Sequence, residues 1–390
     1  MQTRAKSGFN QPRLEPRLLL AASEPKTTKQ ALAVPNWLAA MKAEYNALIS
    51  NKPWTLAHLP THRQAIGTYY HQDYTFYHIT IRIILSITLT YRWSIQELNV
   101  NNAFLNGLLD GEVYMAQPQG FEQDNPNLVC RFNKASYGLK QAPMQWFERL
   151  QAAALVQLKF RPSKCDPSLF TYFEEGHTVY LLVYVDDIII TGSSTSLLKS
   201  IITKLNVAFS LKHLGVLDYF LGIQVTRIDP QSLLLTQSKY VKDLLLKTNM
   251  SDCAPVSTPM QSTCKLTKAG SPAFGDPYMY RSVVGALRYA TLTRPDIAYA
   301  VNKVCQFMAH PLDTHWVEVK RILRYLKGTL THGLQLTSLS STSAPSVQLF
   351  CDADWASDPD DRRSPSGAVI YFGPNLVSWW SKKVDCCGSI

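Results

Sequence analysis

Two adjacent aspartates inside an apolar hairpin constrain this chain more than any other feature. Asp186 and Asp187 follow Tyr184 and Val185, and apolar runs precede and follow them. This pattern predicts a β-hairpin over residues 179–191. A carboxylate buried without a partner is costly, so the pair should either lie exposed at the turn or hold a cation. Carboxylate oxygens suit Mg²⁺, and two such ions can clamp a phosphoryl transfer. The hairpin alone leaves both interpretations open.

Strands and helices alternate around this hairpin, which predicts a mixed α/β arrangement for the first 250 residues. A strand is expected at 95–100, followed by a turn or short helix over 101–109. Further strands are expected at 347–351 and 368–372. The predicted helices cover residues 137–155, 197–205, 238–246, 280–291, 296–308 and 315–330.

The first helical pattern should begin after Asn36, a plausible N-cap. Its apolar residues recur on one helical face, at Trp37, Met41, Tyr45 and Leu48. Residues 77–93 are ambiguous. Their β-branched content favours a strand, whereas their length favours a helix.

Composition limits the location and the partners of the chain. The formal net charge is +10, which favours a polyanionic partner such as nucleic acid, although a basic surface can also serve solubility alone. The eight cysteines form no Cys-x-x-Cys pair, so we expect reduced thiols in an intracellular protein and no zinc finger. The longest apolar stretch, residues 77–93, contains His78, Arg82 and Arg92 and is too short to span a membrane.

Several longer motifs, in a fixed order, resemble the reverse-transcriptase region of copia-type LTR-retrotransposon polyproteins. The first is the Tyr184–Asp187 turn itself, which is similar to the catalytic turn of reverse transcriptases. The others are Trp37-Leu38 with Met41, Glu44, Ala47 and Leu48; Tyr137-Gly138-Leu139-Lys140-Gln141-Ala142-Pro143 with Trp146; Phe220-Leu221-Gly222-Ile223; Thr293-Arg294-Pro295-Asp296-Ile297; and Arg321-Ile322-Leu323-Arg324-Tyr325-Leu326-Lys327-Gly328. The resemblance covers nearly the whole chain.

The resemblance implies an α+β fold with an order of parts. Residues 1–35 would be a basic, disordered linker, and 36–250 the fingers and palm, with the fingers partly deleted. Residues 251–338 would form a helical thumb or connection, 339–346 a linker, and 347–390 the start of an incomplete ribonuclease H-like α/β domain.

The resemblance also implies roles for individual residues. Asp186 and Asp187 would be catalytic and would hold Mg²⁺. Phe104, Lys140 and Gln141 would contact the incoming dNTP, with Phe104 blocking a ribose 2′-hydroxyl. The partners would be an RNA template and a DNA primer, or an RNA–DNA hybrid, without a membrane. The location would be cytoplasmic, in a virus-like particle, or nuclear.

The chain departs from the family pattern at Asn99, where the family has an aspartate that bridges both metals. An asparagine keeps the shape but loses the charge, and would offer one weak carbonyl ligand. We expect a loss of about a thousandfold or more in rate. Glu97 shares a strand face with Asn99 but should lie about 7 Å away along the strand. It therefore cannot replace the missing carboxylate.

Two further departures concern length. Only residues 61–72 remain where the family carries a long fingers segment with basic residues, and Arg63 is expected at the surface there. In the region that resembles ribonuclease H, Asp352 would be the first metal ligand, and the other acidic residues would lie beyond Ile390. We therefore expect a degenerate copy that has no ribonuclease H activity.

One predicted helix carries a basic stripe. Over residues 315–330, the basic residues Lys320, Arg324 and Lys327 occupy one face of the helix, and the apolar residues occupy another. This stripe could follow a phosphate backbone, or it could be an ordinary solvated face. His310 and His315 are expected to be capping or surface residues.

The sequence thus predicts an RNA-directed DNA polymerase by descent, with its activity lost. The alternatives are a nucleic-acid-binding remnant without catalysis and a degenerate product without function.

Overall fold

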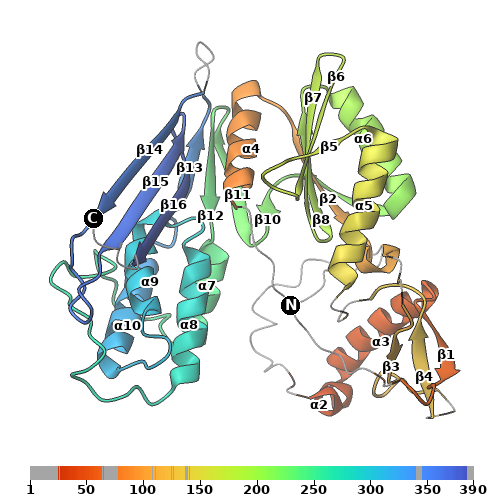
Figure 1. The fold of residues 1–390 in the computed structure, drawn as a ribbon, viewed down its shortest axis with the longest axis horizontal. Coiled ribbons are helices and arrows are strands. Elements are labelled where there is room, and N and C mark those ends of the chain that lie inside the picture. The colour runs from red at the N-terminus through yellow and green to blue at the C-terminus, as the bar shows by residue number, and fades with distance from the viewer. Residues whose placement is uncertain are drawn as a thin grey trace.

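The protein is described by a computed structural model, which covers residues 25, 27–63, 65, 78–107, 109, 111–123, 125, 127–136, 139, 141–339 and 345–383. Across these residues, helices and strands mix in an α+β arrangement, and the strands form four sheets. Figure 1 shows the two larger sheets side by side with helix α4 between them. A smaller unit that contains the first strands lies below the sheet on the right.

The central sheet has six strands in the order β5-β6-β7-β8-β2-β9, and all of its neighbours are antiparallel. The strands are β2 (Ile95–Val100), β5 (Arg161–Pro162), β6 (Leu169–Glu174), β7 (His177–Tyr184), β8 (Asp187–Gly192) and β9 (Leu211–Val216). Strands β7 and β8 form the hairpin predicted over 179–191, and β2 confirms the strand predicted at 95–100.

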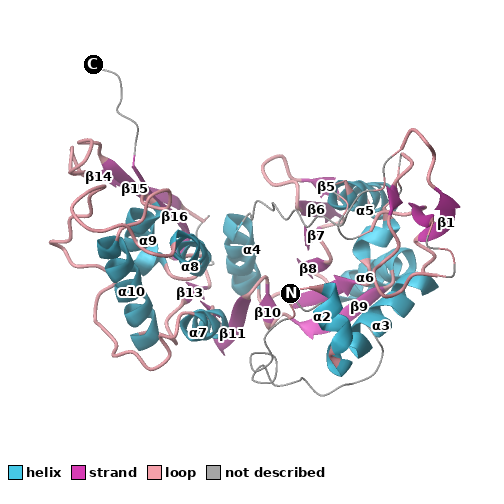
Figure 2. Ribbon diagram, turned by 90° about the horizontal axis from the view of Figure 1, so that it is seen from below, coloured by secondary structure: helices cyan, strands magenta, loops and turns pink. Residues whose placement is uncertain are grey.

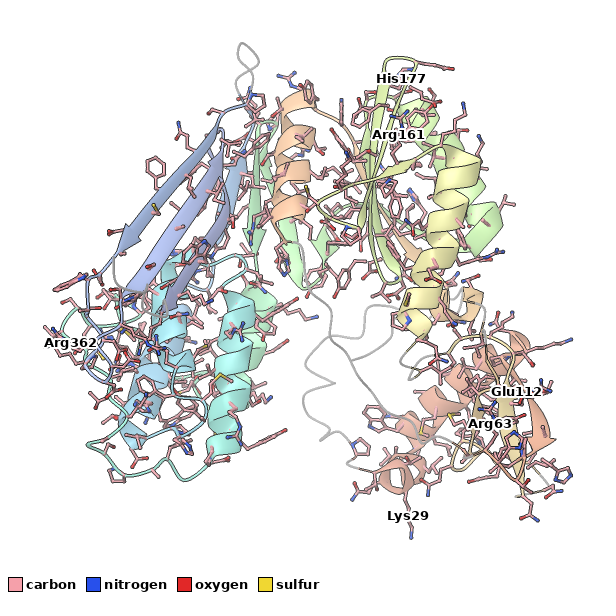
Figure 3. All side chains as sticks on the ribbon, in the orientation of Figure 1. Lys29, Arg63, Glu112, Arg161, His177 and Arg362 are labelled. Atoms are coloured by element: carbon pink, nitrogen blue, oxygen red, sulfur yellow. The ribbon has the colours of Figure 1, made fainter. Side chains whose placement is uncertain are left out.

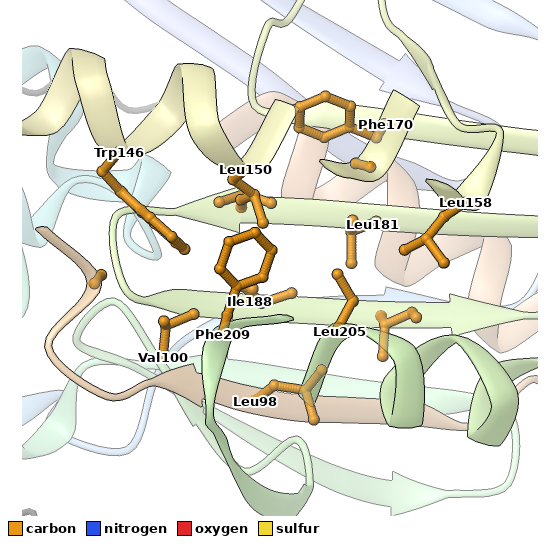
Figure 4. Packing of buried hydrophobic residues seen from close by; sticks show 14 of the residues in the cluster. Leu98, Val100, Trp146, Leu150, Leu158, Phe170, Leu181, Ile188, Leu205 and Phe209 are labelled. Atoms are coloured by element: carbon orange, nitrogen blue, oxygen red, sulfur yellow. The ribbon is translucent and has the colours of Figure 1, made fainter. Parts of the chain in front are cut away.

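Helices α5 (Ala142–Leu158) and α6 (Thr195–Phe209) cover one face of this sheet, as Figures 1 and 2 show. The side chain of Ser194 accepts a hydrogen bond from the Leu197 amide and so caps α6. Trp146, Leu150 and Phe170 pack with the inward residues of β2, β7 and β8 (Figure 4). This cluster is the main core, and it fixes the strand ends that carry the two aspartates.

Helix α4 (His78–Tyr91) settles the ambiguity at 77–93 in favour of a helix. It packs with the opposite face of the central sheet and with a second sheet, ordered β10-β11-β12-β13. The strands of that sheet are β10 (Tyr219–Phe220), β11 (Ile223–Asp229), β12 (Ser232–Thr236) and β13 (Leu334–Thr337). None of the helices in the described ranges is both long and apolar enough to cross a membrane.

A cluster of helices follows in the chain. It contains α7 (Ser238–Lys247), α8 (Pro277–Ala290), η2 (Pro295–Ile297), α9 (Ala298–Cys305) and α10 (Asp313–Gly328). Their apolar faces share one core. Arg294, 2 % exposed, lies at its edge and binds Asp296 and the Thr329 carbonyl. Helix α7 belongs to this core although it lies before the boundary predicted at residue 250.

The last sheet contains β14 (Val347–Ala353), β15 (Pro365–Phe372) and β16 (Asn375–Lys383), one strand more than expected. Strand β14 is an exposed edge. The opposite edge is held to α4 by Arg82, which is 5 % exposed. Its guanidinium donates to the Val377 carbonyl at 2.7 Å and to the Leu292 carbonyl at 2.6 Å, and lies 4.0 Å from the centre of the Trp379 ring.

The N-terminal unit corrects two predictions. It contains α2 (Thr28–Ala33), α3 (Pro35–Ser50), β1 (Trp54–His58), β3 (Tyr114–Met115) and β4 (Leu128–Phe132). Helix α2 lies within the stretch predicted to be a disordered linker, of which residues 1–24 and 26 are outside the described part. Asn36 is not the N-cap of α3, because the helix begins at Pro35 and Val34 caps it. Proline's fixed φ suits the first helical position, and the helix therefore begins two residues earlier than an N-cap at Asn36 would place it.

Candidate active site

The acidic turn joins β7 to β8 through a strained residue. Val185 has a φ of +54°, a left-handed conformation that a β-branched residue rarely adopts. Two hydrogen bonds hold the turn in this shape. The indole N–H of Trp146 donates to the Val185 carbonyl at 2.6 Å, and the Val100 amide donates to the Asp186 carbonyl at 2.7 Å. Asp186 and Asp187 are half-buried.

Asn99 lies opposite Asp187 in the register of β2 and β8. Its side-chain Nδ2 donates to Asp186 Oδ2 at 3.2 Å and to Asp187 Oδ1 at 2.9 Å. Only the amide nitrogen can face two carboxylates in this way, because the carbonyl oxygen would bring a third acceptor to them. In this arrangement the amide nitrogen faces the pair, and the expectation that the Asn99 carbonyl would be a weak metal ligand stays a prediction.

The donor set at the turn fits a divalent metal poorly. Among the described residues, no cluster of three or more histidine, cysteine, aspartate or glutamate side chains could hold a metal ion. Glu97, two residues before Asn99, is 3 % exposed and lies opposite Ile189 on β8. It does not add a third carboxylate to the pair.

The residues expected to bind the nucleotide have different surroundings. Phe104 lies in the short helix η1 (Ala103–Asn106), is 4 % exposed and belongs to the main core. Gln141 is exposed at the residue before α5. Lys140 lies outside the described residues. Gly107, the residue that follows η1, packs closely against α5. A Cβ added at this glycine would lie only 3.1 Å from the Trp146 backbone nitrogen. The nucleotide roles of the three residues stay predictions.

The remaining predicted residues lie on other parts of the molecule. Figure 3 shows Arg63 on the N-terminal unit, where its side chain is exposed, as expected. Most of the shortened segment at 61–72, namely residues 64 and 66–72, is outside the described part. Asp352 is exposed on β14, and its carboxylate accepts from the adjacent Ala353 amide.

The basic stripe lies on α10, but part of it has a structural contact. Arg324 Nε donates to the Ala254 carbonyl at 2.7 Å and so holds the connection after α7 against α10. Lys320 and Lys327 are half-exposed on the same helix. His315 was expected to be either a capping or a surface residue. It is a capping residue, and it is fully buried. Its Nδ1 accepts from the Leu312 amide, its Nε2 contacts the Thr267 carbonyl, and burial lowers its pKa.

Comparison with known proteins identifies the family. Residues 74–262 match the model of the reverse transcriptase (RNA-dependent DNA polymerase) family. The chain is 42 % identical, over 98 % of its length, to the retrovirus-related Pol polyprotein from transposon RE2 of Arabidopsis thaliana. A protein of Saccharomyces cerevisiae that is named a putative transposon Ty5-1 protein is 30 % identical, and the match covers 92 % of that protein. The chain belongs to the reverse-transcriptase family of copia-type retrotransposon Pol polyproteins.

This reverse-transcriptase chain spans only part of its larger relatives. It covers 29 % of the length of the RE2 polyprotein. The Pol polyprotein from transposon TNT 1-94 of Nicotiana tabacum is 38 % identical over 79 % of the chain, and the match covers 24 % of that protein.

Sequence reasoning missed the support of the reverse-transcriptase turn. The sequence identified Trp146 only as a member of a family motif and predicted no role for it, yet its indole donates the hydrogen bond that holds the Val185 carbonyl. The only sequence signal for a role of Trp146 was that it shares a motif with Gln141, and this motif lies far from the turn in the sequence. The role of the Asn99 amide as a donor was also missed, because a sequence gives no side-chain orientation.

Proposed function

We propose that this chain is the reverse-transcriptase part of a copia-type retroelement by descent, and that it no longer catalyses RNA-directed DNA synthesis. Residues 36–250 correspond to fingers and palm, 251–338 to a helical thumb or connection, and 347–390 to the start of a ribonuclease H-like domain. The ancestral substrates are dNTPs on an RNA template with a DNA primer, inside the cell.

A single observation supports the loss of activity. Both N–H bonds of the Asn99 amide point to Asp186 and Asp187, at the place where the family pattern has a third carboxylate. Reverse transcriptases use Mg²⁺ to stabilise the charge that develops on the transferred phosphate. Here the site has two carboxylates and a neutral donor, so we derive no catalytic step through a metal. A negatively charged ligand that touches the metal contributes several kcal/mol to such stabilisation, or about a thousandfold or more in rate.

Primer extension tests this proposal. The full chain is given a primed RNA template, dNTPs and Mg²⁺, beside the variant Asp186→Ala. We expect no extension above this variant. We also expect none from Asn99→Asp alone, because the segment at 61–72 keeps only one arginine or lysine, Arg63, where the family has several basic residues that would grip the triphosphate. Extension by the natural chain that Asp186→Ala abolishes would overturn the proposal.

Retained binding of nucleic acid is a second candidate function, and the net charge of +10 together with the cations on α10 favours it. An RNA–DNA hybrid should bind with an affinity that falls steeply as salt rises. Filter binding across a salt series measures this. The double variant Lys320→Ala/Lys327→Ala should reduce the salt slope, and an affinity independent of salt would exclude this function. A degenerate product, in contrast, would unfold broadly instead of in one sharp transition.

A further inference from the structure

We propose that Asn99 takes the place of the divalent cation at the acidic turn, so that the turn is stable without metal and responds weakly to Mg²⁺. This inference deepens the proposed function, since it explains what holds Asp186 and Asp187 together in a chain without polymerase activity. It concerns folding and metal binding, and it can be measured without any assay of catalysis.

Geometry is the first support. The Asn99 amide donates one hydrogen bond to each aspartate, at 3.2 Å to Asp186 Oδ2 and 2.9 Å to Asp187 Oδ1. It thereby links two carboxylates that would otherwise repel each other. A cation bound between two carboxylates would have the same bridging position. The amide is covalently attached to β2, so it is always present at the turn.

Competition is the second support. For Asn99 to bind a metal, its side chain must rotate so that the carbonyl oxygen replaces the amide nitrogen. That rotation breaks both hydrogen bonds and leaves two carboxylates facing a third oxygen acceptor. A metal must therefore displace an existing interaction, and would gain only one neutral ligand in return. Binding of Mg²⁺ should be correspondingly weak.

The frame of the turn needs no metal either. The Val185 and Asp186 carbonyls accept hydrogen bonds from the Trp146 indole and from the Val100 amide, respectively. Neither contact involves a carboxylate oxygen. The charge of residue 99 can therefore be changed while the turn keeps its backbone support.

The variant Asn99→Asp tests the inference, because it replaces the donor by a third carboxylate of nearly the same shape. Without metal, three clustered carboxylates should lower the Tm of the full chain by about 5 °C or more. Millimolar Mg²⁺ should restore most of this loss, whereas the natural chain should have the same Tm in Mg²⁺ and in EDTA. Titration calorimetry should detect Mg²⁺ binding to the variant only.

Two further variants keep the test decisive. Asn127→Asp adds the same charge on an exposed loop and should show neither the loss nor the rescue. If Asn99→Asp does not fold, Asn99→Ala replaces it: without the amide, the Tm should fall in EDTA and rise with Mg²⁺. The inference is overturned if the natural chain gains as much Tm from Mg²⁺ as the variant does, or if neither substitution at Asn99 makes the Tm depend on Mg²⁺. Primer extension by the natural chain, in contrast, would overturn only the proposed loss of activity.

Discussion

Replacing Trp146 by phenylalanine should destabilise the protein and loosen the acidic turn. Trp146 is 1 % exposed, and its ring lies edge-on to Phe209 with the centroids 5.2 Å apart. Its indole N–H is the donor to the Val185 carbonyl at 2.6 Å. Phenylalanine keeps the aromatic contact in part, but it removes the donor and leaves a small cavity.

The cost can be worked from these contacts. Val185 is half-buried, and a carbonyl shielded from water that loses its donor costs about 1–3 kcal/mol. The missing part of the indole ring removes apolar burial equivalent to roughly two methylene groups, at about 0.8 kcal/mol each. Val185 then loses the contact that offsets its left-handed backbone, which itself costs about 1–2 kcal/mol and favours rearrangement of the turn. Together, we expect the free energy of unfolding to fall by about 3–5 kcal/mol.

Urea denaturation followed by far-ultraviolet circular dichroism measures this change without relying on tryptophan fluorescence. The matched control is Trp355→Phe, since the Trp355 side chain is 91 % exposed and the same atoms are removed there. The control should change the unfolding free energy by less than about 0.5 kcal/mol. If Trp146→Phe is as stable as this control, the indole hydrogen bond does not hold the turn and our reasoning fails.

Two other predictions concern α4. Arg82→Met should cost about 2–6 kcal/mol in urea denaturation, because the Val377 and Leu292 carbonyls both lose their donor, whereas Arg281→Met on the exposed face of α8 should cost little. An equal effect of both variants would show that Arg82 does not hold β16. Burial first, and then the nearby Arg82 charge, lowers the pKa of His78 from 6.5 to about 4. Unfolding then takes up a proton between these values, so the stability that is complete above pH 6.5 should fall as the pH approaches 4. In denaturation curves collected across this window, His78→Gln should flatten the dependence, and an unchanged slope would refute the assignment.

The sequence predicted best those elements whose pattern has a single physical explanation. The apolar runs around Asp186 could only be adjacent strands, and the hairpin β7–β8 is where it was expected. Helix α4 was ambiguous for an equally physical reason. This helix packs against two sheets, so it is buried on more than one face. Its buried residues include the polar Ser86 as well as Ile81, Leu85 and Leu89, and the sequence therefore does not alternate between one apolar and one polar face.

The candidate site was predictable in composition but not in chemistry. The residues Asp186, Asp187 and Asn99 follow from the hairpin and from the family pattern. The direction of the Asn99 amide does not, because an asparagine carries both a donor and an acceptor, and only its surroundings in the fold decide which of them faces the aspartates. The support from Trp146 also depends on packing between α5 and the turn, which are separated by 39 positions in the chain.

The fold and the proposed chemistry of the acidic turn depend on different atoms, so the loss of one does not entail the loss of the other. The core behind the turn is formed by Trp146, Leu150 and the inward faces of β2, β7 and β8. The proposed loss of activity, in contrast, depends on the charge of a single side chain on β2, that of residue 99. The Asn99 amide donates a hydrogen bond to each of Asp186 and Asp187, so it joins the two carboxylates without cancelling their charge. Under the proposal above, a chain with Asn99 retains the fold, because the Trp146 indole and the Val100 amide hold the backbone of the turn whatever the charge of residue 99.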